Sequence, residues 1–264
     1  MAPQPITAVI GTVVVLFSAA CTATHKGPGT RNDDRSHQPS SPLASPDFTV
    51  GDPCPPSKDA ALGPGTGCAS YTSADLDGDG RAERIAVFAF LRPDRMPASW
   101  SVASESRSLH VVHPLNVEVA TTYPRVLGAA DANGDGRAEI FVSVANHLFH
   151  SGGFLEVGVL VLHDERLVRV RANGRPFRFP LGGLTHFGSG ALCSKREPAR
   201  LILFDIRNVN TGVFPTLSRF VYEWRGPALH LAHEGERRLP IKGYGSRKVL
   251  RYYALRCGSL RVNG

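Results

Sequence analysis

The chain has 264 residues, a net charge of +7 and 42% hydrophobic residues. This length suits one large or two small domains, and the apolar fraction is sufficient for a buried core, so the composition excludes wholesale disorder and a fibrous repeat. Five cysteines are present. An odd number in an exported protein predicts that one thiol has a separate role.

The first 20 residues predict a signal peptide rather than a part of the fold. Residues 6–20 form an uncharged run that ends in small residues, and this run is shorter than the roughly 20 residues of a membrane-spanning helix. It closes with Ser18-Ala19-Ala20-Cys21, which resembles the lipobox of bacterial lipoproteins. The resemblance implies that Cys21 is lipidated and anchors an extracytoplasmic protein to the membrane. The alternative is an ordinary cysteine just beyond a signal-peptidase site.

Residues 21–47 predict a disordered tether between this anchor and the folded domain. Between residues 22 and 46 there is no aromatic residue and only one large aliphatic side chain, Leu43, while Pro, Ser, Gly, Asn and Asp are abundant. Such a segment cannot bury enough apolar surface to become ordered. We therefore expect the folded domain to span residues 48–264.

Four cysteines remain for disulfides: Cys54, Cys68, Cys193 and Cys257. Disulfides persist outside the cytoplasm, but the sequence allows three pairings of four cysteines. The segment between Cys54 and Cys68 is rich in Pro and Gly and has little apolar content, so that a local bridge would help to order it. Cys193 would then pair with Cys257.

The most informative motif is a nine-residue loop that occurs twice. Residues 75–83 read DLDGDGRAE and residues 131–139 read DANGDGRAE, so seven of nine positions are identical. Side-chain oxygens at positions 1, 3, 5 and 9, together with the backbone carbonyl at position 7, can surround a hard cation, and such a set suits Ca²⁺ better than Mg²⁺. Asp/Gly turns without a metal are the alternative. The predicted ligands of the two Ca²⁺ sites are Asp75, Asp77, Asp79, Arg81 and Glu83, and Asp131, Asn133, Asp135, Arg137 and Glu139.

Position counting separates two families that share the start of this loop. An EF-hand requires a bidentate Glu at position 12, where this chain has Ala86 and Val142, and it requires flanking helices. Here apolar, strand-like sequence follows each loop. The pattern D-x-[DN]-x-D-G-x-x-[DE] running into a strand resembles the calcium loop of FG-GAP repeats, which are also found in the integrin alpha-chain propeller. The resemblance implies a β-propeller-like repeat domain with structural calcium.

The repeat spacing and the apolar runs predict an all-β, propeller-like domain of about four small blades. The two loops start 56 residues apart, which is close to the size of a four-stranded blade. A third copy starts near Phe187, but its loop has lost the metal ligands, with Cys193, Lys195, Glu197 and Leu201 at positions 1, 3, 5 and 9. A disulfide from Cys193 could replace the missing metal. A fourth blade would combine residues 247–262 with a strand near residues 48–50.

Charge and motifs give the functional expectation. Residues 195–264 contain 14 Lys/Arg and 5 Asp/Glu, which predicts a solvated basic surface. Anionic lipid headgroups or cell-wall polymers are better partners for it than nucleic acid, because the chain has no nucleic-acid-binding motif. No catalytic motif is found either. We expect a non-enzymatic binding or scaffold module whose ligand is a protein or a cell-wall glycan, and the alternative is a secreted propeller-type hydrolase or lyase.

Overall fold

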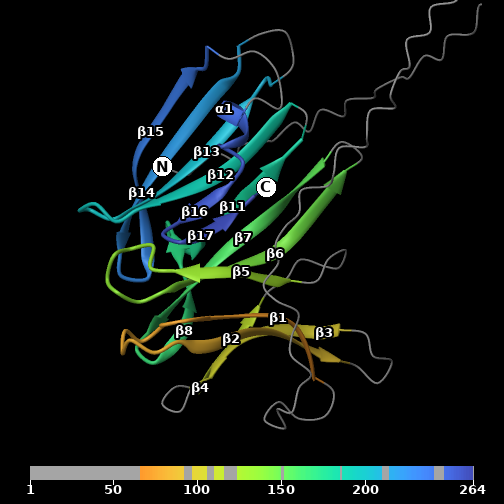
Figure 1. Cartoon of the computed structure of the whole chain (residues 1–264), viewed down its shortest axis with the longest axis vertical. Coiled ribbons are helices and arrows are strands. Elements are labelled where there is room, and N and C mark those ends of the chain that lie inside the picture. The colour runs from red at the N-terminus through yellow and green to blue at the C-terminus, as the bar shows by residue number, and fades with distance from the viewer. Residues whose placement is uncertain are drawn as a thin grey trace, which may run out of the picture. The chain divides into compact units, whose positions relative to one another are not determined.

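β-Strands, most of them paired antiparallel, make up most of the residues that the computed structural model describes (Figure 1). The structure describes residues 66–91, 97–105, 110–115, 124–149, 152–184, 186–209, 214–240 and 247–263. The all-β prediction is confirmed, because the short apolar and alternating runs of the sequence form strands. The one helix among these residues is α1 (Arg247–Leu250).

Three four-stranded meanders follow the sequence repeat. Each begins with a strand, a loop and a second strand, and then adds two further antiparallel strands. Within each meander, every strand pairs with the next strand along the chain. The meanders are β1 (Thr66–Ala74), β2 (Glu83–Leu91), β3 (Pro97–Glu105) and β4 (His110–Leu115); β5 (Arg125–Ala130), β6 (Glu139–Phe149), β7 (Gly152–His163) and β8 (Arg166–Arg169); and β12 (Phe187–Ser194), β13 (Arg200–Arg207), β14 (Thr216–Arg225) and β15 (Ala228–Arg238).

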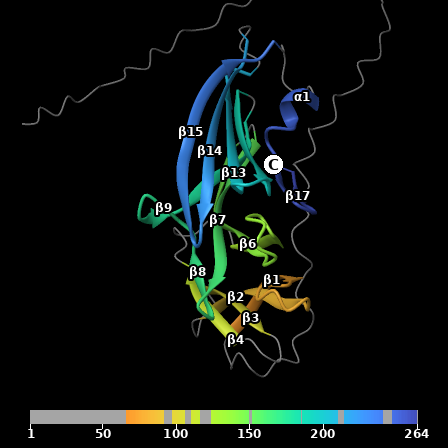
Figure 2. The ribbon, with the colours of Figure 1, turned by 90° about the vertical axis from the view of Figure 1, so that its left-hand side faces the viewer.

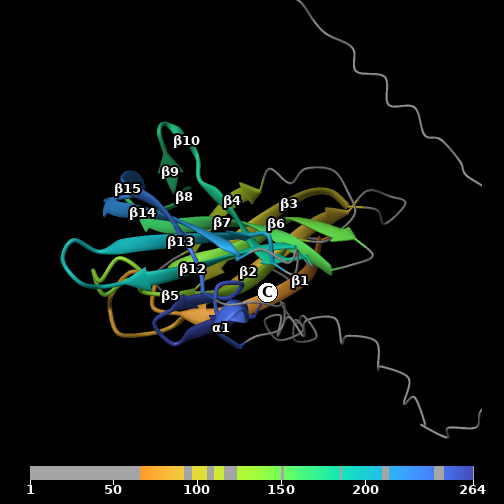
Figure 3. The ribbon, with the colours of Figure 1, turned by 90° about the horizontal axis from the view of Figure 1, so that it is seen from above.

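The second and third meanders belong to one continuous sheet. Strand β11 (Arg178–Gly183) pairs with β7 on one side and with β12 on the other. The long strand β7 also pairs with β8 through Leu160–His163, beyond the part that contacts β11. Short strands β9 (Arg171–Ala172) and β10 (Arg175–Pro176) form a hairpin at the β15 edge (Figure 3).

The described strands do not form a closed ring of separate blades, so the propeller prediction is not confirmed. The physical reason is β11, which joins the second and third meanders edge to edge where a propeller would keep its blades apart. The predicted fourth blade also differs. Residues 247–262 form α1 and the hairpin of β16 (Leu255–Cys257) and β17 (Leu260–Val262), and β16 pairs in parallel with β12. Residues 48–50 lie outside the described part.

The core explains why the first half of strand β6 is rich in apolar residues. Ile140, Val142 and Val144 are fully buried in a cluster with Ile85 of the first meander. Phe141, which points to the other face because side chains alternate along a strand, is buried in the cluster of the large sheet. Strand β6 is therefore covered on both faces, and this arrangement brings the β1–β2 and β5–β6 loops together.

The predicted Cys193–Cys257 disulfide is present in the structure. Cys193 is in strand β12 rather than in a loop, opposite Leu201 of β13. The bridge joins β12 to β16 at the position after their paired residues Leu192 and Arg256. It therefore fastens the C-terminal hairpin to the third meander.

Several predictions fall outside the described residues. They concern the signal peptide, the lipidation of Cys21, the tether of residues 21–47 and the Cys54–Cys68 bridge, for which the structure describes neither Cys54 nor the side chain of Cys68. In the part of the chain that is described, no helix has both the length and the apolar character needed to cross a membrane.

Candidate metal centre

The two repeated loops connect equivalent strand pairs in the same way. In the first meander Ala74 pairs with Glu83, and in the second Ala130 pairs with Glu139. Both loops place glycines at positions 4 and 6 in the left-handed region, with φ of 82° at Gly78 and comparable values at the others. Only glycine adopts this conformation without steric cost, so the Gly-x-Gly spacing allows the chain to turn sharply twice.

Side chains at positions 1, 3 and 5 of the first loop accept hydrogen bonds from the loop's own backbone. Asp75 Oδ1 accepts from the amide of Gly78 at 2.7 Å, and its Oδ2 accepts from the amide of Gly80 at 2.8 Å. Asp77 and Asp79 each accept from the amide two residues further on, at 3.0 and 2.8 Å. These bonds hold the carboxylates in a fixed arrangement on one short loop.

The glutamate at position 9 is buried in both loops. Glu83 is 1% exposed and Glu139 is 2% exposed. In each case Oε2 accepts a hydrogen bond from the amide at position 2, which is Leu76 at 2.6 Å and Ala132 at 2.5 Å. A buried carboxylate is costly unless it is paired with a cation, so each loop presents an acid whose burial favours a positive partner.

The electrostatic cost is visible at Glu139. Burial is the largest cause that raises its pKa, from 4.5 to about 8; the hydrogen bond from the Ala132 amide lowers the pKa, and the charges of Asp135 and Asp131 raise it. An opposite charge close by would favour the carboxylate form. The second loop thus concentrates negative charge that a bound cation would balance.

The first loop brings three of its predicted ligands into one cluster. One carboxylate oxygen each of Asp75, Asp77 and Glu83 lies within 4.8 Å of the others. Asp79 is exposed and does not belong to this group. Oxygens at this spacing suit a hard divalent cation, and the carbonyl of Arg81 remains a predicted ligand.

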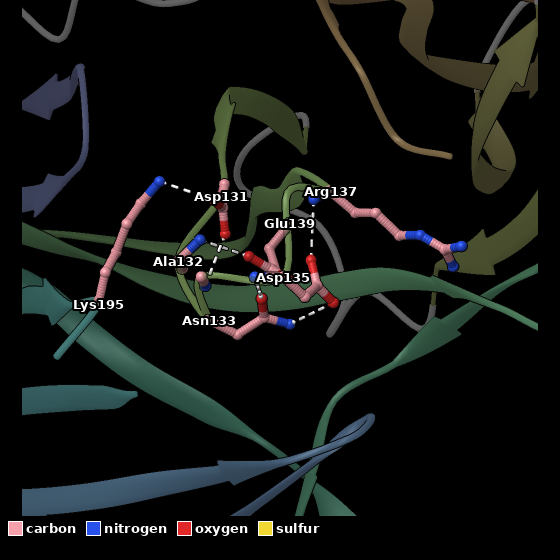
Figure 4. A network of polar contacts seen from close by, with 8 residues as sticks. Asp131, Ala132, Asn133, Asp135, Arg137, Glu139 and Lys195 are labelled. Carbon is pink, nitrogen blue, oxygen red and sulfur yellow. Dashed lines mark hydrogen bonds and ion pairs between the residues drawn. The ribbon is translucent and has the colours of Figure 1, made fainter. Parts of the chain in front are cut away.

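The second loop differs at its first and third positions (Figure 4). Lys195, from the connection between β12 and β13, places Nζ 2.7 Å from Asp131 Oδ2. The equivalent oxygen of Asp75 accepts a hydrogen bond from the backbone amide of Gly80 instead. Asn133 replaces an aspartate at position 3, and its amide group donates to Asp135 Oδ2 at 3.0 Å. The second loop therefore has one carboxylate fewer and already holds a cationic side chain.

Lys195 shows how the third repeat contributes to the site. The connection that replaces its metal loop spans only residues 195–199, because Ser194 pairs with Arg200. The sequence identified Lys195 as a lost ligand position but did not reveal its contact with Asp131. No local signal could have found it, since the two residues are 64 positions apart.

The first loop contacts the second, and the second contacts the β12–β13 connection that stands in place of the third loop. The amide of Ala138 in the second loop donates to the carbonyl of Asp75 in the first at 2.7 Å. A Cβ atom at Gly78 would lie 3.3 Å from Arg137 Cγ, and one at Gly134 would lie 3.6 Å from Lys195 Cβ. The repeats are therefore coupled through their loops as well as through their cores.

No known protein family, curated protein or solved structure matches the chain.

Proposed function

We propose that the chain is an extracytoplasmic lipoprotein whose FG-GAP-like β-repeat domain binds structural Ca²⁺ and acts as a binding or scaffold module at the cell surface, without catalysis of its own. The observation that carries the metal part of this proposal is the cluster of Asp75, Asp77 and Glu83 in the first loop. The blade-like meanders are consistent with the repeat resemblance, and they hold the loops between packed strands.

Calcium fits the first loop because its donors are all oxygens. Ca²⁺ accepts six to eight oxygen ligands in flexible geometry, whereas Mg²⁺ demands an octahedron and retains water. Three carboxylates together with a backbone carbonyl and water molecules meet the requirement of Ca²⁺. An ion there would hold the β1–β2 connection against the β5–β6 loop that donates to it.

The two loops should fill in order. Within the described residues no carboxylate of the first loop forms an ion pair, whereas Asp131 must release Lys195 before it can serve a metal. The Lys195 side chain is 50% exposed, and ion pairs of this exposure contribute about 0.2–1 kcal/mol. We therefore expect a tighter first site and a weaker second site.

Calcium titration of the full-length protein by calorimetry tests the calcium-binding part of this proposal. The expected result is two sites of unequal affinity, with binding of Mg²⁺ much weaker at both. Lys195→Ala should tighten the weaker site by up to about fivefold, in line with the ion-pair energy. Arg196→Ala removes an exposed neighbouring charge and should leave both affinities unchanged. The absence of calcium binding would contradict the proposal, and equal affinities unaffected by Lys195→Ala would contradict the order.

The lipid anchor has a separate test. Cys21→Ser removes the only thiol to which the lipobox-like sequence could attach a lipid. We expect the variant to lose incorporation of labelled palmitate, since the modification requires that sulfur. Cys54→Ser in the same assay controls for the loss of a cysteine and should retain the label. Equal labelling of the Cys21→Ser variant and the natural protein would refute lipidation at this residue.

A further inference from the structure

A groove lined by arginines lies on one face of the large sheet, over strands β12–β15. It has a volume of about 520 Å³, and we call it the arginine groove after Arg219, Arg237, Arg251 and Arg256 in its lining. The segment that contains α1 and β17 lies beside this face of the sheet (Figure 2). The volume falls within the range of about 300–1,000 Å³ that is typical of small-molecule sites.

Strand register brings the sheet arginines to one face. Arg219 of β14 lies opposite Gly235 of β15, and Leu217 lies opposite Arg237. Residues two apart on a strand share a face, so that both guanidinium groups extend from the same side of the sheet. Gly235 has no side chain, and the ring of His233, which also lines the groove, lies over it, with Nε2 3.1 Å from the position that a Cβ atom would take. Arg256 reaches the groove from β16, where it pairs with Leu192 of β12.

The four arginines have no carboxylate partner among the described residues. Elsewhere Arg178, Arg200 and Arg207 each pair with an acid within 3.2 Å. In the groove the only acidic residue of the lining is Glu236, and it forms no ion pair within the described part.

Their hydrogen bonds go to neutral oxygens instead. Arg251 and Arg237 donate to the same Tyr252 hydroxyl, at 2.7 and 3.4 Å. Arg256 donates to the carbonyl of Arg251 at 3.0 Å. Arg219 has no described hydrogen-bond partner and is exposed. Four positive charges that line one groove without a paired carboxylate repel one another, and an anion between them would relieve this repulsion.

The floor of the groove is apolar. Leu192 is 37% exposed, and Ile202, Phe204 and Leu217 complete the floor. The Phe204 ring meets the Tyr252 ring edge-on, with centroids 5.2 Å apart. A site with a cationic rim and an apolar floor matches a ligand with an anionic head and a short apolar body.

We propose that the arginine groove binds a soluble organic phosphate that carries a short apolar group. A phosphomonoester has about −1.5 to −2 charges at pH 7 and three strong acceptor oxygens, so it can engage several guanidinium forks at once. A carboxylate would balance only one of the four arginines. The size of the groove favours a free small molecule over a membrane surface. This inference does not depend on calcium binding.

The test is calorimetric titration of the full-length protein with butyl phosphate, inorganic phosphate and butanol. Butyl phosphate should bind most tightly, inorganic phosphate more weakly, and butanol not measurably. The affinity for butyl phosphate should fall as the NaCl concentration is raised, because salt screens the attraction between the phosphate and the guanidinium groups.

Matched variants assign the binding to the groove. Arg219→Ala should weaken butyl phosphate binding by about tenfold or more, as expected for the loss of a charge-assisted contact. The Arg219 side chain is exposed and forms no hydrogen bond or ion pair with the described residues, so the fold should tolerate the change. Arg225→Ala, on the same strand but outside the groove lining, should change the affinity less than about twofold.

Three outcomes would overturn the proposal: equal affinity of Arg219→Ala and the natural protein for butyl phosphate, butyl phosphate binding no tighter than butanol, or binding to phosphatidylglycerol vesicles but not to butyl phosphate. The vesicle result would assign the arginines to a membrane surface. Phosphatidylcholine vesicles serve as the neutral control.

Discussion

Glu83→Gln is expected to abolish most of the calcium-dependent stability of the first loop while leaving the calcium-free protein at least as stable as before. The amide oxygen of glutamine can still accept the hydrogen bond from Leu76 that Glu83 accepts at 2.6 Å. The negative charge is lost, and with it a ligand for the ion. Because Glu83 is only 1% exposed, removing its charge without calcium removes a buried and unbalanced carboxylate.

The size of the effect follows from linkage. If calcium is present at about 100 times Kd, each site adds about 2.7 kcal/mol to the free energy of unfolding. For a domain of 150–250 residues, about 1 kcal/mol corresponds to about 2–4 °C in Tm. Thermal unfolding in calcium and in EDTA should therefore show a gap several degrees smaller for Glu83→Gln than for the natural protein.

Glu139→Gln provides the matched control at the second loop. It removes the equivalent buried carboxyl group, which could ionise on binding a cation, and preserves the equivalent hydrogen bond from Ala132. Because Lys195 already binds Asp131, the second site should be less occupied at limiting calcium, and Glu139→Gln should then reduce the calcium-dependent gap less than Glu83→Gln. A gap that neither substitution changes would show that calcium does not stabilise the fold through these loops.

The loop chemistry could be predicted from sequence because it is local. Positions 1, 3, 5 and 9 lie within nine residues, and the glycines that shape the turn are part of the same motif. The structure accordingly groups Asp75, Asp77 and Glu83. What sequence could not reveal was the difference between the loops, because Lys195 reaches Asp131 across 64 residues and only the packing of the third repeat brings them together.

The strands were also predictable, but not their assembly into sheets. Alternation and apolar runs identify strands such as residues 139–149, of which residues 139–144 are buried. The number and closure of blades depend on which edges pair, and that choice is not local. The run of residues 178–183 pairs with β7 and β12, and this bridging strand is what departs from the propeller expectation.

The second large effect concerns the disulfide. We expect Cys193→Ala combined with Cys257→Ala to lower the free energy of unfolding by about 4 kcal/mol, because the bridge closes a loop of 64 residues and restricts the unfolded chain accordingly. Chemical denaturation of the variant and of the natural protein under oxidising conditions measures the difference. The natural protein with its bridges reduced is the control, and it should lose at least as much stability as the variant.

Loss of the bridge should also be felt locally at the C-terminal hairpin. Strand β16 pairs with β12 at only two residues, Ala191 and Leu192, and the hairpin lies close to Gly190, where any side chain would meet the backbone of Ala254. This docking has few hydrogen bonds of its own, including that from the amide of Ala191 to the carbonyl of Ala254 at 3.0 Å. Hydrogen exchange should therefore accelerate in residues 255–262 of the variant more than in β13 and β14, because no covalent link then restrains the hairpin against β12 when it opens locally. Uniform acceleration across the large sheet would instead show that the bridge acts only by restricting the unfolded chain and gives the hairpin no local stability.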